Sequence, residues 1–297
     1  MRKKIKSGLV ITTAFCLCFP NFMVQAQENS QDPIASQYTS QSLTAETESI
    51  IADVEEQYGI PKSYFYDIVE MYFENGHTDL DELNSAIQDA ANQVCYTCEK
   101  TDIEYEQAFS EYQANVTSSA EEKANTAYDS AMTIYIVGIS KVRNRNCPQT
   151  AKSMEHAIVP KASVGTGWKP GRLFYNNDGW SRFLITTQAL FQKIEGQFQH
   201  ELNSGKDVIT VNGSHEFTSE NSSLDALAQL HEVDYSITFV KTSDGVGYVG
   251  NYLISDVYDF AWGNYNNFEL GFGNNYCKAV QDAGFIAPYP ISIAGRL

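Results

Sequence analysis

The first half of the chain repeats apolar residues at helical spacing. Residues 43–58 place Ile51, Val54 and Tyr58 on one helical face. The same spacing predicts four more helices, which cover residues 63–75, 78–98, 103–116 and 120–143. Amphipathic helices with short connections are typical of a helical bundle. Residues 131–139 are apolar almost all round, so we expect them to be buried between this half and the rest of the chain.

After a loop-rich linker, the pattern changes to short strands. β-Branched and aromatic residues alternate on both sides of the turn Thr242-Ser243-Asp244-Gly245, which predicts a β-hairpin. Asn212-Gly213, a strong tight-turn signal, predicts a second hairpin. Further helices are predicted over residues 181–202, 224–230 and 276–283. The predicted organisation is a helical region (43–147), a linker (148–172) and an α+β domain (173–297). The fold class is therefore α+β, with an N-terminal all-helical, bundle-like region before an α+β domain that contains antiparallel hairpins.

The first 42 residues predict a targeting segment instead of a part of the fold. Four basic residues precede an apolar run over residues 9–19, and Val24 and Ala26 suit cleavage by signal peptidase. We expect residues 1–26 to be a signal peptide and residues 27–42 to be a disordered leader, which makes the protein periplasmic or secreted. No stretch approaches the roughly 18 apolar residues of a membrane-spanning helix.

Acidic residues are concentrated in the first half. Residues 27–131 contain 22 acidic and 3 basic residues, whereas residues 132–297 contain 15 and 13. This imbalance makes nucleic acid and anionic membrane surfaces poor partners for the first half. It leaves open both a cationic partner and a merely solvated helical surface. Given export, we expect the partner to be a cell-envelope component or an extracellular molecule.

Four cysteines follow the predicted signal peptide. An even set (Cys95, Cys98, Cys147 and Cys277) in an exported chain predicts two disulfides, with three connectivities open. Cys95 and Cys98 close a helical segment, whereas a thioredoxin-like redox pair would open a helix after a strand. The spacing of Cys147 and Cys277 is unlike the second half of a zinc site. Structural disulfides are therefore the favoured interpretation.

Candidate catalytic residues gather where the predicted hairpin ends. Asp256, Tyr258 and Asp259 end its second strand, and His231 precedes its first. Two carboxylates at a strand end suit an acid/base pair or a divalent-metal site, and Tyr258 would position a substrate. The structural alternative is that the aspartates accept hydrogen bonds from loop amides and that His231 follows a helix end. The sequence contains no nucleotide-binding loop, dinucleotide fingerprint, HExxH or GxSxG motif.

Asp256-Val257-Tyr258-Asp259 resembles the D-x-Y-D motif of colicin M-type bacteriocin domains. Members of that family are periplasm-acting, metal-dependent hydrolases of the lipid-linked peptidoglycan precursor. The resemblance implies an envelope-acting, toxin-like hydrolase. The family motif continues after five residues with His-Arg, where this chain has Tyr265-Asn266. His231 would then stand in for the missing histidine.

An aromatic stretch supports a different class of function. Residues 261–276 are rich in Asn, Gly and aromatic side chains, and Trp262 and Tyr265 are the candidates for contact with a ligand. The alternative to the hydrolase is therefore a non-enzymatic secreted binding or adhesive protein that uses this loop surface.

Overall fold

The computed structural model describes residues 42–118, 124–176, 179–185, 188–202, 205–218, 221–262 and 268–297, and it confirms the α+β class. The predicted signal peptide lies outside these residues. The helices are α3 (Ala45–Tyr58), α4 (Lys62–Glu74), α5 (Leu80–Ser118), α6 (Ala124–Asn144), α7 (Pro148–His156), α8 (Gly179–Ile185), α9 (Gln188–Leu202), α10 (Leu224–Gln229) and α11 (Phe268–Asp282), with a 3-10 turn at Lys161–Ser163. The strands are β1 (Leu173–Asn176), β2 (Val208–Glu216), β3 (Glu232–Lys241), β4 (Tyr248–Tyr258) and β5 (Tyr289–Arg296).

These strands form a sheet in the order β1-β5-β4-β3-β2. The pairs from β2 to β5 are antiparallel, and β1 is parallel to β5. The predicted hairpin is confirmed, because β3 and β4 pair directly around a turn in which the Asp244 carboxylate accepts the Val246 N–H. This hairpin occupies the middle of the sheet.

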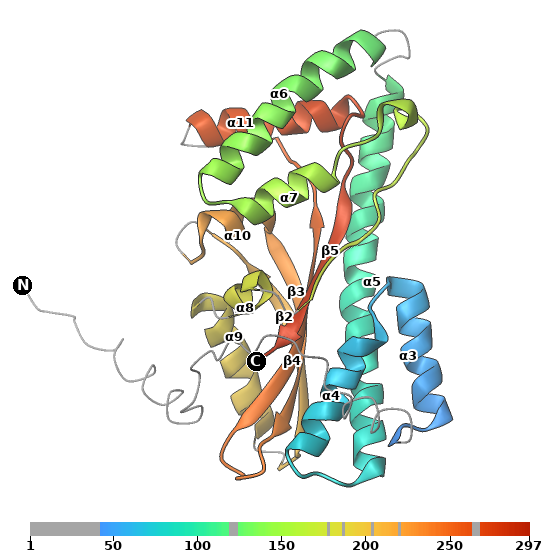
Figure 1. Cartoon of the computed structure of the whole chain (residues 1–297), viewed down its shortest axis with the longest axis vertical. Helices are drawn as coiled ribbons and strands as arrows, with labels where there is room; N and C mark the ends of the chain where they lie inside the picture. The colour runs from blue at the N-terminus through green and yellow to red at the C-terminus, as the bar shows by residue number, and fades with distance from the viewer. Residues whose placement is uncertain are drawn as a thin grey trace, which may run out of the picture.

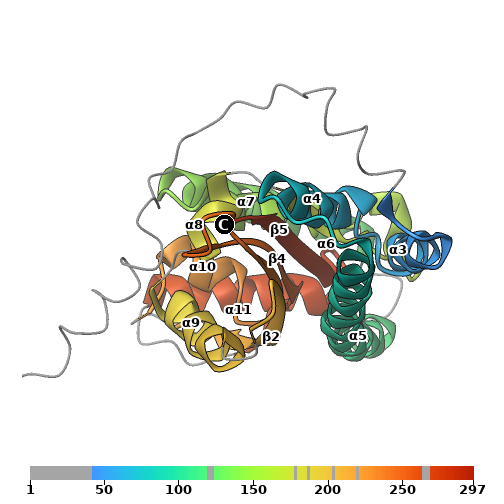
Figure 2. The ribbon, with the colours of Figure 1, turned by 90° about the horizontal axis from the view of Figure 1, so that it is seen from below.

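Helices cover both faces of the sheet (Figure 1, Figure 2). On one face, Tyr235, Ile254 and Ile291 belong to the larger hydrophobic core with residues of α6 to α11. On the other face, Val240 and Leu253 pack with α3, α4 and α5. Because both faces are covered, nearly every residue of β3 and β4 is buried. The N-terminal helices therefore form one of two helical layers on the sheet.

The long helix α5 differs from its prediction. The apolar spacing lapses over residues 99–102, which predicted two helices, but the structure has one helix of 39 residues. No Gly or Pro interrupts it, and Thr101 continues its buried stripe by donating its hydroxyl to the Thr97 carbonyl at 3.0 Å. Phe109 then packs near Val257 at the far end of the sheet. A satisfied buried hydroxyl thus replaces an apolar residue in the helical pattern.

The hairpin predicted at Asn212-Gly213 is wrong. β2 runs straight through both residues, with Asn212 opposite Ser236 and Gly213 opposite Tyr235. Glycine is needed there for space, because a Cβ at position 213 would lie 2.7 Å from the Tyr235 hydroxyl. Close packing in the sheet therefore overrides the turn preference of the dipeptide.

The proline-containing C-terminal tail forms β5, which the sequence pattern did not predict. Pro290 lies opposite Val257 of β4 in a strand between two neighbours. Proline is unfavourable inside a sheet because it has no N–H to donate. On the other side, however, β1 pairs only with Ile291 to Ala294, so Pro290 lies beyond the end of that ladder.

The expectation that residues 131–139 are enclosed is wrong for one side of α6. Met132, Tyr135 and Ile139 are buried, but Ile134, Ile136 and Val137 are 54%, 52% and 50% exposed. The reason is that α6 lies on the outside of the molecule at one end, where only one of its sides meets the core (Figure 1).

The predicted disulfides are absent from the described part of the chain. Cys95, Cys98, Cys147 and Cys277 are all free thiols. Burial raises the pKa of Cys98 and that of Cys277 to about 12 each. Cys98 packs in the core between α5 and the sheet. Buried thiols with raised pKa are unreactive, which indicates packing roles for Cys98 and Cys277.

Among the described helices, none is long and apolar enough to cross a membrane.

Candidate functional site

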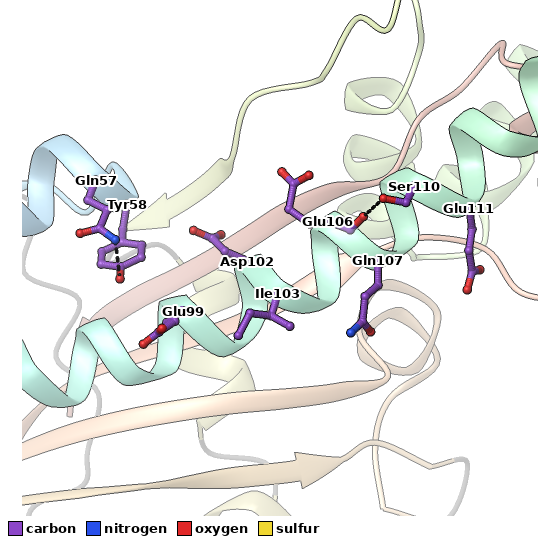
Figure 3. A pocket seen from close by; sticks show the side chains of 9 residues that line it. All are labelled: Gln57, Tyr58, Glu99, Asp102, Ile103, Glu106, Gln107, Ser110 and Glu111. Atoms are coloured by element: carbon purple, nitrogen blue, oxygen red, sulfur yellow. Dashed lines mark hydrogen bonds between the residues drawn. The ribbon is translucent and has the colours of Figure 1, made fainter.

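The outward face of α5 carries an open hollow where α3 ends (Figure 3). Its volume is about 660 Å³. The residues that line it are Gln57, Tyr58, Glu99, Asp102, Ile103, Glu106, Gln107, Ser110 and Glu111. Most of them come from α5, because residues three, four and seven positions apart share one face of a helix. We call this feature the α5 hollow.

Carboxylates dominate the α5 hollow. Four of its lining residues are Asp or Glu, and none is Lys or Arg. Two cations reach it from the linker: Arg172 pairs with Asp102 at 2.5 Å, and Lys169 pairs with Glu106 at 2.8 Å. Glu99 and Glu111 have no salt bridge to any described residue. The lining therefore keeps negative charge that no described cation balances.

Two groups at the hollow, Asp102 and Tyr58, have raised pKa values. Burial raises the pKa of Asp102, even though Arg172 acts in the opposite direction, and the charge of Glu106 raises it further. Burial also raises the pKa of Tyr58, and nearby negative groups that include Glu99 add to the rise. A bound cation would favour the ionised forms, because an opposite charge lowers the pKa of an acid. The electrostatics of the hollow thus suit a cationic ligand.

The end of β4 brings Asp256 close to His231, as the sequence suggested. Asp256 is only 6% exposed. Its Oδ2 accepts the His231 backbone N–H at 3.1 Å, and its Oδ1 accepts the Val257 N–H at 2.7 Å. Burial raises the pKa of Asp256 well above its usual range, although both N–H donors act in the opposite direction. Asp256 therefore joins the start of β3 to the end of β4.

Asp259, the first residue after β4, completes this group. Burial raises its pKa, whereas His231 and Lys278 favour its ionised form. Glu111 raises the pKa of Asp259 further, and Glu111 also lines the α5 hollow. We call His231, Asp256, Asp259 and Lys278 the strand-end cluster.

Tyr258 lies in the larger hydrophobic core. Its ring centroid is 5.3 Å from that of Tyr289 and 5.2 Å from that of Phe260. Burial raises the pKa of Tyr258 well above its usual range, and its hydroxyl has no hydrogen-bond partner among the described residues. Tyr258 thus makes packing contacts instead of occupying the surface position that contact with a substrate needs.

The structure describes only one of the two aromatic candidates for ligand contact, Trp262 and Tyr265. Trp262 is 60% exposed, and its indole N–H donates to Asp282 Oδ2 at 3.2 Å. Tyr265 lies outside the described residues. Part of the stretch predicted as a loop belongs to α11, where the Tyr276 hydroxyl donates to the Ala131 carbonyl at 2.8 Å. Trp262 is therefore the aromatic candidate with a described surface position.

The described residues contain no group of three His, Cys, Asp or Glu side chains that could hold a metal ion. Both oxygens of Asp256 already accept backbone N–H groups. The divalent metal that a carboxylate pair suggested stays a prediction.

Sequence reasoning missed the α5 hollow. The signal was present, because Glu99, Asp102 and Glu106 follow the three- and seven-residue spacing of one helical face. The same spacing also describes an ordinary solvated face, however. Only the position of α3 beside that face distinguishes a hollow from a plain surface.

Comparisons of this chain with protein-family models, curated protein sequences and solved structures gave no match. Function is therefore inferred from the geometry.

Proposed function

We propose that this protein is an exported, non-catalytic binding protein that captures a cationic polypeptide segment in the α5 hollow. The observation that carries the proposal is the lining of the hollow, which holds four carboxylates and no Lys or Arg. Ile103 in the same lining is 54% exposed, so an apolar contact is available beside the charges. Export follows from the signal peptide predicted for residues 1–26.

Electrostatics at longer range favour the same partner. The 22 acidic and 3 basic residues of segment 27–131 create a negative field that attracts cations to this half of the molecule. A Lys- or Arg-rich segment would place its charged groups near Glu99 and Glu111, while its aliphatic stems cover Ile103. Glu99 and Glu111 would then gain the counter-charge that no described residue gives them.

Calorimetry with an oligolysine peptide tests this proposal. We expect the full chain to bind oligolysine and not oligoglutamate, with an affinity that falls as salt is added. Glu99→Gln/Glu111→Gln removes two charges from the hollow without leaving a cation unpaired, and it should weaken binding by roughly tenfold.

The matched control is Asp81→Asn/Asp89→Asn, which removes two exposed charges from the same helix outside the hollow. This variant should bind like the parent. If both double variants lose the same affinity, the attraction is a general property of the acidic surface. If the folded parent does not bind oligolysine at low salt, the proposal is rejected.

The strand-end cluster supports a second candidate, the envelope-acting, toxin-like hydrolase implied by the D-x-Y-D resemblance. The observation that favours it is the grouping of Asp256, Asp259 and His231 at one end of the sheet. In such a reaction, a buried carboxyl with a raised pKa, here Asp256, would donate a proton. The more accessible Asp259 would act as the base.

Cleavage of the lipid-linked peptidoglycan precursor by the full chain tests this second candidate. Asp259→Asn should abolish cleavage and leave the melting temperature unchanged, because the Asp259 side chain forms no hydrogen bond or salt bridge with a described residue. Glu232→Gln, an exposed position at the same end of the sheet, should keep activity. A folded parent that cleaves nothing, or equal activity of both variants, would remove the hydrolase candidate.

A further inference from the structure

An apolar strip on α6 faces solvent. It consists of Ile134 and Val137, which lie three positions apart on one side of the helix and are each at least half exposed. β-Branched side chains are weak helix formers, and exposed apolar area costs free energy in water. If solvent were the only neighbour on this side, polar residues there would make the helix more stable. The strip therefore indicates a surface that is covered when the protein acts.

The end of α6 beside this strip is basic, although the protein as a whole is acidic. Residues 132–147 contain Lys141, Arg143 and Arg145 and no acidic residue. All three basic side chains are exposed. Arg143 pairs with Glu155 at 2.8 Å, but both side chains are about half exposed, and such pairs are weak. The charge at this end thus fits an anionic partner.

An exposed aromatic residue lies near the helix that supports α6. Trp262 donates its indole N–H to Asp282, the last residue of α11. α11 contacts α6 through the hydrogen bond from Tyr276 to Ala131, and the two helices lie together at one end of the molecule (Figure 1). Tryptophan is enriched at membrane–water interfaces because it combines an apolar ring with a polar N–H.

We propose that this end of the molecule docks on the surface of an anionic lipid bilayer. The strip of Ile134 and Val137 enters the boundary between headgroups and acyl chains, and Lys141, Arg143 and Arg145 at the end of the helix contact lipid phosphates. Apolar side chains next to a basic helix end are the combination that such a surface recognises. The contact is peripheral, because no described helix is able to span a membrane.

The negative net charge of the whole chain does not prevent this contact with anionic lipid. Salt screens charges beyond about 10 Å, so the local charge of α6 determines the interaction with headgroups. A second copy of the chain is a poorer occupant of the strip. Two copies that met through this surface would bring their like basic side chains together, and the one acidic residue described on α6, Asp129, already pairs with Lys161.

Sedimentation with sucrose-loaded vesicles tests the proposal on the full chain recovered after export by a bacterial host. We expect binding to vesicles of phosphatidylcholine with phosphatidylglycerol and much less to phosphatidylcholine alone. Ile134→Gln/Val137→Gln should lower the partition coefficient roughly tenfold, because it removes the inserted apolar area. Lys141→Gln/Arg143→Gln should remove the preference for phosphatidylglycerol.

The matched control is Leu80→Gln/Val246→Gln, which changes two other exposed apolar residues to the same polar residue. This control should bind vesicles like the parent. The proposal is overturned if the parent binds neither kind of vesicle, or if the α6 variants bind as well as the control. It is also overturned if analytical ultracentrifugation shows a parent dimer that Ile134→Gln/Val137→Gln dissociates, since a second copy would then cover the strip. None of these outcomes depends on the binding of oligolysine.

Discussion

Asp256 connects two strands through a carboxyl group that is unfavourably placed for carrying a charge. The His231 and Val257 N–H groups both donate to it, which satisfies backbone donors at the junction of β3 and β4. Its burial nevertheless raises its pKa well above the usual range, because desolvation disfavours the ionised form. The structural role that the sequence left open is therefore visible in its contacts, and it makes this junction sensitive to pH.

This sensitivity predicts a pH-dependent effect of Asp256→Asn on the free energy of unfolding. Between the unfolded pKa of about 3.9 and the raised folded pKa, the native state binds a proton that the unfolded state has lost. The contribution of Asp256 to stability therefore falls as pH rises through that window. Urea unfolding should show the stability advantage of the parent over Asp256→Asn shrinking from about pH 4 upward. A difference that does not change with pH would contradict this account.

Asp244 provides a control of opposite sign. The Thr242 hydroxyl and the Val246 N–H donate to its carboxylate, which lowers the pKa of Asp244. Its contribution is present above its unfolded pKa and is lost as pH falls through its folded pKa. The advantage of the parent over Asp244→Asn should therefore shrink on acidification, in the same urea experiments.

At the scale of elements, β2 illustrates how one close contact outweighs a local turn preference. The Tyr235 hydroxyl donates to Gln197 of α9 directly above Gly213, so the helix, the strand and its neighbour meet at one point. Gly213 is needed because it has no Cβ and not because of its backbone conformation, since it is not among the described residues with positive φ. The dipeptide therefore acts in packing and not in a turn.

Gly213→Ala should destabilise the protein by about 1–3 kcal/mol, because its Cβ would clash with the Tyr235 ring and hydroxyl. Gly196→Ala on α9 is the matched control, since nothing lies within 4 Å of the added Cβ. Alanine favours the helix there and should stabilise by about 0.5–1 kcal/mol. Thermal unfolding of the two variants measures both effects. Equal effects of the two substitutions would show that space at Gly213 is not limiting.

At the scale of the whole molecule, charge of opposite sign is segregated onto different helices. The acidic α5 hollow belongs to the layer on one face of the sheet, whereas the basic end of α6 belongs to the layer on the other face. The two partners that we propose, a cationic polypeptide and an anionic bilayer, would therefore bind to different helical layers. A protein with both would hold a cationic segment near a membrane surface.

The sequence predicted those parts of the fold that depend on local pattern. The helical spacing found α3 and α4, and the alternation around Thr242 found the β3–β4 hairpin. Predictions failed where distant residues compensate for a local preference. β5 tolerates Pro290 because β1 ends beside it. For the candidate site, Asp256 accepts the backbone N–H of His231, and the sequence did not show that Tyr258 would be enclosed in the core.

By itself, the sequence determined the α+β class, the central hairpin and the concentration of acidic residues before position 132. These features follow from periodicity and composition, which neighbouring residues along the chain already contain. Only the tertiary structure decided which helical faces are open, namely the hollow of α5 and the apolar strip of α6. The physical reason is that every amphipathic helix presents a polar and an apolar side, and burial depends on which other elements pack against each side.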